Sequence, residues 1–221
     1  LFIVKGNEGP KTYLFVDEYD ELKEKWTGKR LTLDEARTLS GVQDIMLTKN
    51  LGTKIDEALR ESGQFGAIKT LYLDLEKELK ISMGFTTKDL SNQLGARYPQ
   101  LEILDVFDFI MRQRMIKSAA EVNSMKAAVA TTHLGLKAIM KNIRVGMYEY
   151  QLEALFRYTI RDAANAGLAF DTIIASGKNA TILHYPTPND KIADGALVLC
   201  DLGARYGQYS SDITRTYPAS G

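Results

Sequence analysis

Two aspartates near the end of the sequence, Asp201 and Asp212, are the residues best placed to do chemistry together. Between them, Tyr206 and Gly207 predict a two-residue hairpin turn, because glycine readily takes the positive φ that a short turn needs. With that turn, Asp201 would lie directly opposite Asp212 on neighbouring antiparallel strands. Carboxylates that face each other repel, so this pairing predicts either a cation between them or a shared proton.

A structural role for the two aspartates also fits the pattern, because an aspartate beside a hairpin often only caps a turn. Asp201, however, directly follows the apolar run at residues 196–199, which is typical of a buried strand. A charge that continues a buried strand is costly unless it is paired or bound to a metal. The geometry alone leaves both the structural and the metal-binding interpretation open.

The two histidines and the single cysteine are the other candidate site residues. His184 ends an apolar stretch just before two prolines, a position that fits either a packed or a catalytic histidine. His133 borders the apolar stripe of a predicted helix and is interpreted as structural. Cys200 precedes Asp201 on the same strand, so it should point to the opposite face and fill the core.

The elements that must position these residues fall into two blocks. Strands and helices alternate over residues 1–107, which predicts an α/β layered domain. The second block opens with a capping box at Ser118 and Glu121 and a long amphipathic helix. A second helix is expected at residues 149–166, closed by Gly167, then a strand at 170–176, a separate strand carrying His184, and the hairpin.

The composition excludes several classes of partner. The 221 residues include 28 basic and 28 acidic side chains, and this zero net charge argues against a general nucleic-acid or membrane-surface binder. A single cysteine allows no internal disulfide and fits a cytoplasmic setting. No apolar stretch reaches the roughly 18 residues of a membrane helix. The sequence starts without methionine inside a predicted strand, so we expect a fragment.

Three segments resemble the pita-bread metallopeptidases, the family of aminopeptidase P, prolidase and methionine aminopeptidase. They are Ile116-Lys-Ser-Ala-Ala-Glu-Val122, then Ile174-Ala-Ser-Gly-Lys-Asn179 leading into Leu183-His-Tyr185, and finally Asp201-Leu-Gly203 with Ser211-Asp-Ile-Thr-Arg-Thr-Tyr217. Residues 1–107 resemble the N-terminal domain of aminopeptidase P, prolidase and creatinase, which methionine aminopeptidases usually lack. The resemblance implies an α/β creatinase/prolidase-like domain over residues 1–107. The truncated first half of an α+β pita-bread catalytic domain would follow over residues 108–221.

The resemblance also implies a metal site. The family binds two divalent metals with two Asp, one His and two Glu side chains. Asp201 would contact one metal and Asp212 would bridge both, while the remaining ligands would come from a second half of the fold that is absent from this chain. His184 matches a family histidine that contacts the substrate or intermediate. Carboxylate-rich ligation suits Mn²⁺, with Co²⁺ or Zn²⁺ as alternatives.

The function implied by the resemblance is metal-dependent hydrolysis of the bond between an N-terminal residue and proline, as in Xaa-Pro aminopeptidases. The partner would be a peptide with proline at its second position, and the full-length protein would be a homodimer. The chain alone is expected to be inactive, because only two ligands are present. The alternatives are a prolidase, a non-catalytic pita-bread module that binds proteins, and a metal-free creatinase-like amidinohydrolase. Two facing carboxylates argue against the last two.

Overall fold

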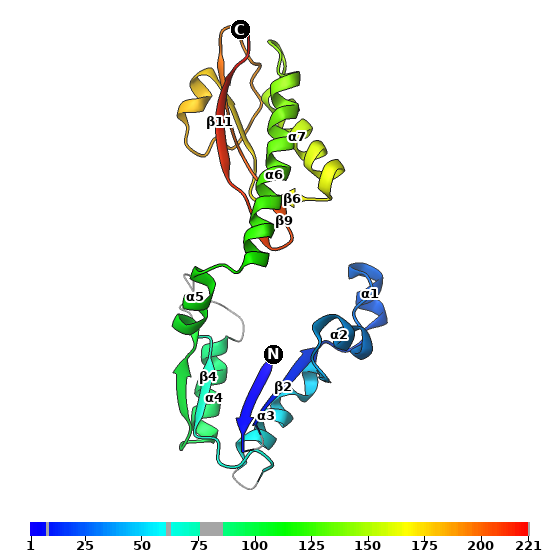
Figure 1. Cartoon of the computed structure of the whole chain (residues 1–221), viewed down its shortest axis with the longest axis vertical. Helices are drawn as coiled ribbons and strands as arrows, with labels where there is room; N and C mark the ends of the chain where they lie inside the picture. The colour runs from blue at the N-terminus through cyan, green and yellow to red at the C-terminus, as the bar shows by residue number, and fades with distance from the viewer. Residues whose placement is uncertain (8, 61–62, 76–85, 221) are drawn as a thin grey trace. The chain divides into compact units, whose positions relative to one another are not determined.

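The computed structural model describes residues 1–7, 9–60, 63–75 and 86–220, and it divides into two compact units, Leu1–Arg112 and Gln113–Gly221 (Figure 1). The N-terminal unit holds two clusters of buried apolar side chains, and the C-terminal unit holds a larger one of its own. Within the described residues, no helix combines the length and the apolar character needed to cross a bilayer.

The N-terminal unit is the α/β structure that the alternating pattern predicted. Its strands form two small sheets, in which β2 pairs antiparallel with β1 and parallel with β3, while β4 pairs parallel with β5. The strands are β1 (Phe2–Gly6), β2 (Gly9–Val16), β3 (Asp44–Leu47), β4 (Thr70–Leu73) and β5 (Glu102–Asp105). The helices are α1 (Glu21–Thr27), α2 (Leu33–Ser40), η1 (Thr48–Asn50), α3 (Leu51–Leu59) and α4 (Thr87–Arg97).

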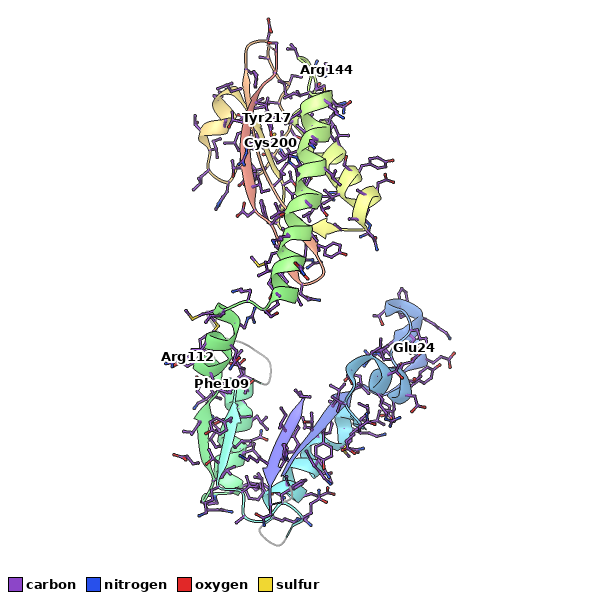
Figure 2. The ribbon with its side chains drawn as sticks, in the orientation of Figure 1. Glu24, Phe109, Arg112, Arg144, Cys200 and Tyr217 are labelled. Carbon is purple, nitrogen blue, oxygen red and sulfur yellow. The ribbon has the colours of Figure 1, made fainter. Side chains whose placement is uncertain are left out.

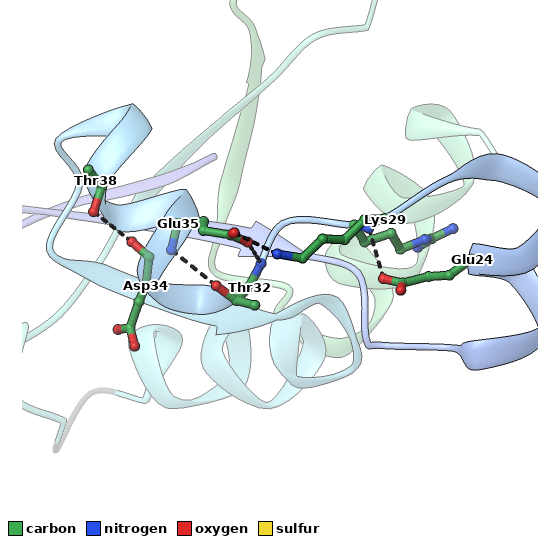
Figure 3. A network of polar contacts seen from close by, with 7 residues as sticks. Glu24, Lys29, Thr32, Asp34, Glu35 and Thr38 are labelled. Carbon is green, nitrogen blue, oxygen red and sulfur yellow. Dashed lines mark hydrogen bonds and ion pairs between the residues drawn. The ribbon is translucent and has the colours of Figure 1, made fainter.

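Helix α2 begins at a capping box formed by Thr32 and Glu35. The Thr32 hydroxyl accepts from the Glu35 amide at 3.2 Å, and the Glu35 carboxylate accepts from the Thr32 amide at 2.8 Å (Figure 3). Lys29 donates to the same carboxylate at 2.7 Å. This side-chain hydrogen bond from Lys29, followed by the bonds from Thr32, lowers the pKa of Glu35 to about 2.

The C-terminal unit packs two helices against antiparallel strands (Figure 1). The strands form two three-stranded sheets, ordered β11-β8-β7 and β10-β9-β6. The helices are α6 (Ala119–Asn142), α7 (Glu149–Ala164) and the short η2 (Gly177–Thr181). The strands are β6 (Gly167–Leu168), β7 (Ile173–Ser176), β8 (Leu197–Leu202), β9 (Ala204–Tyr206), β10 (Tyr209–Ser210) and β11 (Ile213–Pro218).

Cys200 lies in the core of this unit, as expected from its alternation with Asp201. Its side chain is fully buried on β8, and Tyr217 of β11 packs against the same core cluster (Figure 2). Burial raises the pKa of the Cys200 thiol to about 12, so the thiol stays protonated and unreactive while the unit is folded.

Two predictions about individual segments differ from the structure. Helix α7 ends at Ala164 and is capped by Asn165, which has a positive φ of 49° and donates its amide to the carbonyls of Arg161 and Ile160, while Gly167 starts β6. His184 lies in a turn after η2, not on a strand. The two units divide inside α5 (Phe107–Met115), close to the boundary expected after residue 107. The sequence also predicts a helix at residues 51–62, whose last two residues lie outside the described residues.

Candidate metal and substrate site

The hairpin that carries the two aspartates turns one residue later than its sequence predicted. Gly207 and Gln208 form the two-residue loop, with Tyr206 paired to Tyr209. Gly207 has a φ of 58°, as the first central residue of a type II′ turn does. Because the turn moves by one residue, the register of the partner strand moves by two.

The predicted direct pairing of Asp201 with Asp212 is therefore wrong. Asp201 on β8 lies opposite Thr214 of β11, and on its other side it lies opposite Ile173 of β7. Asp212 immediately precedes β11 and is two residues from Thr214. Side chains two residues apart point to the same sheet face, so a two-residue shift keeps both carboxylates on one face.

A pocket of about 610 Å³ forms on this face of the C-terminal unit. Asp201, Asp212 and His184 all line it, so the structure gathers the three residues singled out from the sequence around one space. Asp201 is half-buried, whereas Asp212 and His184 are exposed. The other lining residues are Phe170, Asp171, Thr172, Ile173, Tyr185 and Pro186.

Asp201 is held in place by a hydrogen bond from the residue that lies opposite it on β11. The Thr214 hydroxyl donates to Asp201 Oδ1 at 2.7 Å, which fixes the rotation of the carboxylate. An ionised carboxylate has about four lone-pair sites, so this bond leaves acceptor capacity for a ligand. Thr214 therefore acts as a positioning neighbour of Asp201.

Thr172 brings an unusual hydroxyl to the pocket wall. Its side chain is only 7% exposed, and Thr172 Oγ1 has no hydrogen-bond partner among the described residues. Buried hydroxyls in native proteins are almost always paired, so this unpaired hydroxyl beside the pocket is an exception.

Tyr185, the neighbour of His184, is the most strongly anchored side chain of the pocket wall. Its hydroxyl donates to Glu149 Oε2 at 3.1 Å and lies 3.0 Å from Asn179 Nδ2. Desolvation, with the hydrogen bond to Glu149 second, raises the pKa of Tyr185, so the phenol is neutral at physiological pH.

The donor set suits a hard divalent cation. Two carboxylates on one sheet face and a third, Asp171, at the same pocket are the oxygen ligands that Mn²⁺, Mg²⁺ and Ca²⁺ prefer. Over the ranges that the structure describes, no group of three or more His, Cys, Asp or Glu side chains gathers closely enough to hold a metal ion by itself. Asp201 and Asp212 therefore fit part of a metal shell.

Sequence reasoning missed four residues of this region: Asp171, Thr172, Tyr185 and Glu149. Tyr185 could have been suspected because it adjoins His184. Asp171 and Thr172 could have been suspected because they precede the buried strand β7 in the way that Asp201 ends β8. Glu149 gave no signal, because an acidic residue in the first helical turn is usually an exposed residue that complements the helix dipole.

Two family models match the chain. Aminopeptidase P, N-terminal domain, matches residues 1–65, and metallopeptidase family M24 matches residues 123–221. Among curated proteins, the chain is 29% identical over its whole length to the Xaa-Pro aminopeptidase of Haemophilus influenzae, covering 48% of that protein. It is 28% identical to human Xaa-Pro aminopeptidase 3, with 96% of this chain and 40% of that protein covered. The chain thus spans about half the length of the curated relatives it matches.

Solved structures give the same result. A structure assigned as an aminopeptidase P from Bacillus anthracis superposes with a TM-score of 0.85 at 34% identity, covering 97% of this chain and 50% of that one. Escherichia coli aminopeptidase P with the inhibitor Pro-Leu superposes with a TM-score of 0.80 at 26% identity, covering 97% and 48%. Both family models and both superpositions identify this chain as part of a pita-bread protein of the aminopeptidase P family, with its α/β N-terminal domain followed by part of the α+β metallopeptidase domain.

Proposed function

We propose that the protein containing this chain is a metal-dependent Xaa-Pro aminopeptidase that removes the N-terminal residue preceding a proline. The observation that carries this proposal is the convergence of Asp201, Asp212 and His184 on one pocket of a chain matched throughout by aminopeptidase P. The curated relatives at 27–29% identity from Haemophilus influenzae and Escherichia coli both carry the name Xaa-Pro aminopeptidase. Support for the substrate, a peptide with proline second, comes from these names.

Asp201 and Asp212 would hold the metal ions, Asp201 touching one and Asp212 shared between two. We propose Mn²⁺, with Co²⁺ or Zn²⁺ as alternatives, because carboxylate oxygens dominate the donors. Bound divalent metals supply a water nucleophile at neutral pH and polarise the scissile carbonyl. The other ligands would lie outside this chain.

His184 would act on the peptide. It is exposed on the pocket wall and would donate to the oxygen on which negative charge develops. Thr214 would keep Asp201 Oδ1 oriented. We further propose a homodimer for the full-length protein and a cytoplasmic setting, which the lone buried thiol of Cys200 suits.

The metal arrangement can be tested on this chain because it has only two histidines, His133 and His184. Paramagnetic Mn²⁺ broadens proton resonances close to it. We expect a Mn²⁺ titration to broaden the imidazole signals of His184 before those of His133, which lies on α6 outside the pocket lining. A His133→Gln variant assigns the two signals. Equal broadening of both histidines contradicts the arrangement.

Variants of the carboxylates complete this test. Asp201→Asn and Asp212→Asn should each remove the selective broadening, because each takes away a charged oxygen ligand. Asp162→Asn, an exposed carboxylate on α7, is the matched control and should leave the broadening unchanged. If the two pocket variants behave like the control, the carboxylates do not bind the metal.

The substrate is tested on the full-length protein with Mn²⁺. We expect release of alanine from Ala-Pro-Ala and none from Ala-Ala-Ala. Cleavage of the dipeptide Ala-Pro without cleavage of Ala-Pro-Ala would instead indicate a prolidase. No hydrolysis of either substrate by metal-loaded protein would indicate a non-catalytic binding module.

A further inference from the structure

Glu149 is a carboxylate buried without a cation. It is the first residue of α7 and is 0% exposed, and among the described residues it has no ion pair. Five donors surround it instead. Oε1 accepts from Ser176 N at 2.7 Å, Ser176 Oγ at 2.8 Å and Asn179 Nδ2 at 3.1 Å, while Oε2 accepts from Tyr185 OH and Asp190 N, both at 3.1 Å.

This arrangement satisfies both oxygens of the carboxylate. All five contacts come from N–H or O–H groups, three at Oε1 and two at Oε2. Burying a polar group costs free energy unless hydrogen bonds replace the lost water, and five donors meet that requirement. The N-terminal end of α7 adds a favourable dipole at the same place.

The donors come from β7 and from the chain that follows it. Ser176 ends β7, Asn179 lies in η2, and Tyr185 and Asp190 belong to the connection that leads to β8. Asn179 Nδ2 also lies 2.9 Å from Asp190 Oδ2, which closes the network. The residues just before the histidine, Ile182 and Leu183, are 50% and 85% exposed, so apolar packing does not hold this stretch.

We propose that Glu149 is a positioning residue for the site, whose carboxylate fixes Tyr185 and thereby sets His184 on the pocket wall opposite the aspartates. Glu149 does not itself line the pocket. What His184 does there rests on the proposed function, whereas the positioning by Glu149 does not. The role requires the carboxylate to accept at both oxygens, because Oε1 holds the β7 and η2 side and Oε2 holds the Tyr185 side.

The test is Glu149→Gln, which keeps the shape but replaces one oxygen by an amide NH2 group. That NH2 group must face donors, so at least one of the Ser176 and Asp190 backbone amides loses its acceptor. We expect amide hydrogen exchange in residues 176–190 to accelerate about ten- to a hundredfold, the range for a buried donor left unsatisfied. Glu153→Gln is the matched control, because this carboxylate one turn along α7 bonds only Arg157 in a partly exposed pair.

Tyr185→Phe covers the case in which Glu149→Gln fails to fold. It removes only the hydroxyl on Oε2, so the Ser176 amide should stay protected while the His184 imidazole signal shifts. The proposal is overturned if folded Glu149→Gln leaves exchange in residues 176–190 and the His184 signal unchanged. It is also overturned if exchange accelerates equally throughout the C-terminal unit, because Glu149 would then be only a stabilising residue.

Activity gives an independent readout that separates positioning from stability. In the full-length protein, Glu149→Gln should lower kcat about 10²-fold on a Xaa-Pro peptide with little change in KM, the size of effect expected when a reacting group is misplaced by about 1 Å. Unchanged kcat in a variant with accelerated exchange overturns the positioning role. If wild-type protein shows no activity at all, the proposed function fails, while exchange and the His184 signal still decide the role of Glu149.

Discussion

At the scale of single residues, Thr172 and Thr132 are both buried threonines, but their hydroxyls differ in hydrogen bonding. The Thr172 hydroxyl has no partner among the described residues, whereas the Thr132 hydroxyl accepts from the Ala204 amide at 2.8 Å and bonds the Ser211 hydroxyl. Replacing an unpaired buried hydroxyl by a methyl group removes a desolvated polar atom without losing a bond. We expect Thr172→Val to leave the free energy of unfolding unchanged or to raise it by up to about 1 kcal/mol.

Thr132→Val is the matched control and should cost about 1–3 kcal/mol, because the Ala204 amide loses the shorter of its two hydrogen bonds and the Ser211 hydroxyl loses its bond to Thr132. Urea unfolding of both variants measures the difference. A loss above roughly 1 kcal/mol for Thr172→Val would contradict the prediction, because the hydroxyl would then have a hydrogen-bond partner in the free protein.

His184 supports a second prediction at this scale. In the full-length protein, His184→Ala should lower kcat about 10²–10³-fold, the usual effect of losing a donor to a developing oxyanion. Its metal content should stay the same, because His184 is proposed to touch substrate and not metal. His133→Ala, on the exposed side of α6, should change neither quantity. Metal analysis with steady-state kinetics on a Xaa-Pro peptide checks this, and a His184 variant that loses its metals contradicts it.

At the scale of elements, the hairpin β9–β10 is tied to the start of α6. Tyr209 OH donates to Glu121 Oε1 at 2.6 Å, and Glu121 also completes the capping box with Ser118. The bond from Tyr209, followed by those from Ser118, lowers the pKa of Glu121 from its ordinary value of 4.5 to about 2. A lowered folded-state pKa means that the stabilisation is complete above pH 4.5 and is lost as the pH falls toward 2.

We therefore expect Glu121→Gln to lower Tm at pH 6, with the difference from wild type shrinking as the pH falls from 4.5 to 2. Tyr209→Phe should make the acid-induced loss smaller and complete it at a higher pH, because the largest cause of the lowered folded-state pKa is gone while the unfolded-state pKa is unchanged. Calorimetric scans across this pH range measure both. A Tm difference for Glu121→Gln that stays constant down to pH 2 would show that ionisation of Glu121 does not matter.

The contact of α6 with α7 gives a packing prediction. A Cβ added at Gly135 of α6 would lie 2.3 Å from Phe156 Cδ2 of α7, so alanine cannot enter without moving a fully buried ring. Overpacking costs about 1–3 kcal/mol, of which better helix propensity returns about 1 kcal/mol. We expect Gly135→Ala to speed labelling of Cys200, the only thiol, by a reagent that reaches it on unfolding. Gly146→Ala cannot serve as the control, because Gly146 has a positive φ that strains alanine. Ala138→Gly on α6 is the control instead, because it measures the effect of helix propensity by itself.

Elements with local signals at their ends could be predicted from the sequence. Helix α6 begins at its predicted capping box, and α2 and α4 begin at capping boxes of the same kind. The hairpin register could not be predicted, because a two-residue loop can place Gly207 at either position of the turn. Tertiary context decides it. A Cβ at Gly203 would lie 1.9 Å from the Ser211 carbonyl oxygen, so the two strands cross closely there.

At the scale of the whole molecule, the shared face of Asp201 and Asp212 could be predicted because a register shift of two residues preserves it. The rest of the site could not, since it depends on long-range packing. Glu149 bonds Tyr185 and Ser176, which are 36 and 27 residues away in the sequence, and nothing in the local sequence of α7 indicates those partners. The placement of the two aspartates depends on one hairpin, whereas the pocket wall depends on how α7, β7, η2 and the connection to β8 pack together.

The small number of metal-ligating side chains in this chain leads to the last prediction. Mn²⁺ in oxygen-rich sites takes about six ligands, and the described part of the chain offers Asp201 and Asp212 without a group of three ligating side chains. Residues 1–221 alone should therefore bind Mn²⁺ weakly and release no alanine from an Ala-Pro peptide. Calorimetry with Asp212→Asn as the control measures binding, and an amino-acid assay measures hydrolysis. Tight binding of two metals, or measurable release, would mean that this chain already holds a complete metal shell and that the ligands assigned to the rest of the protein are not needed.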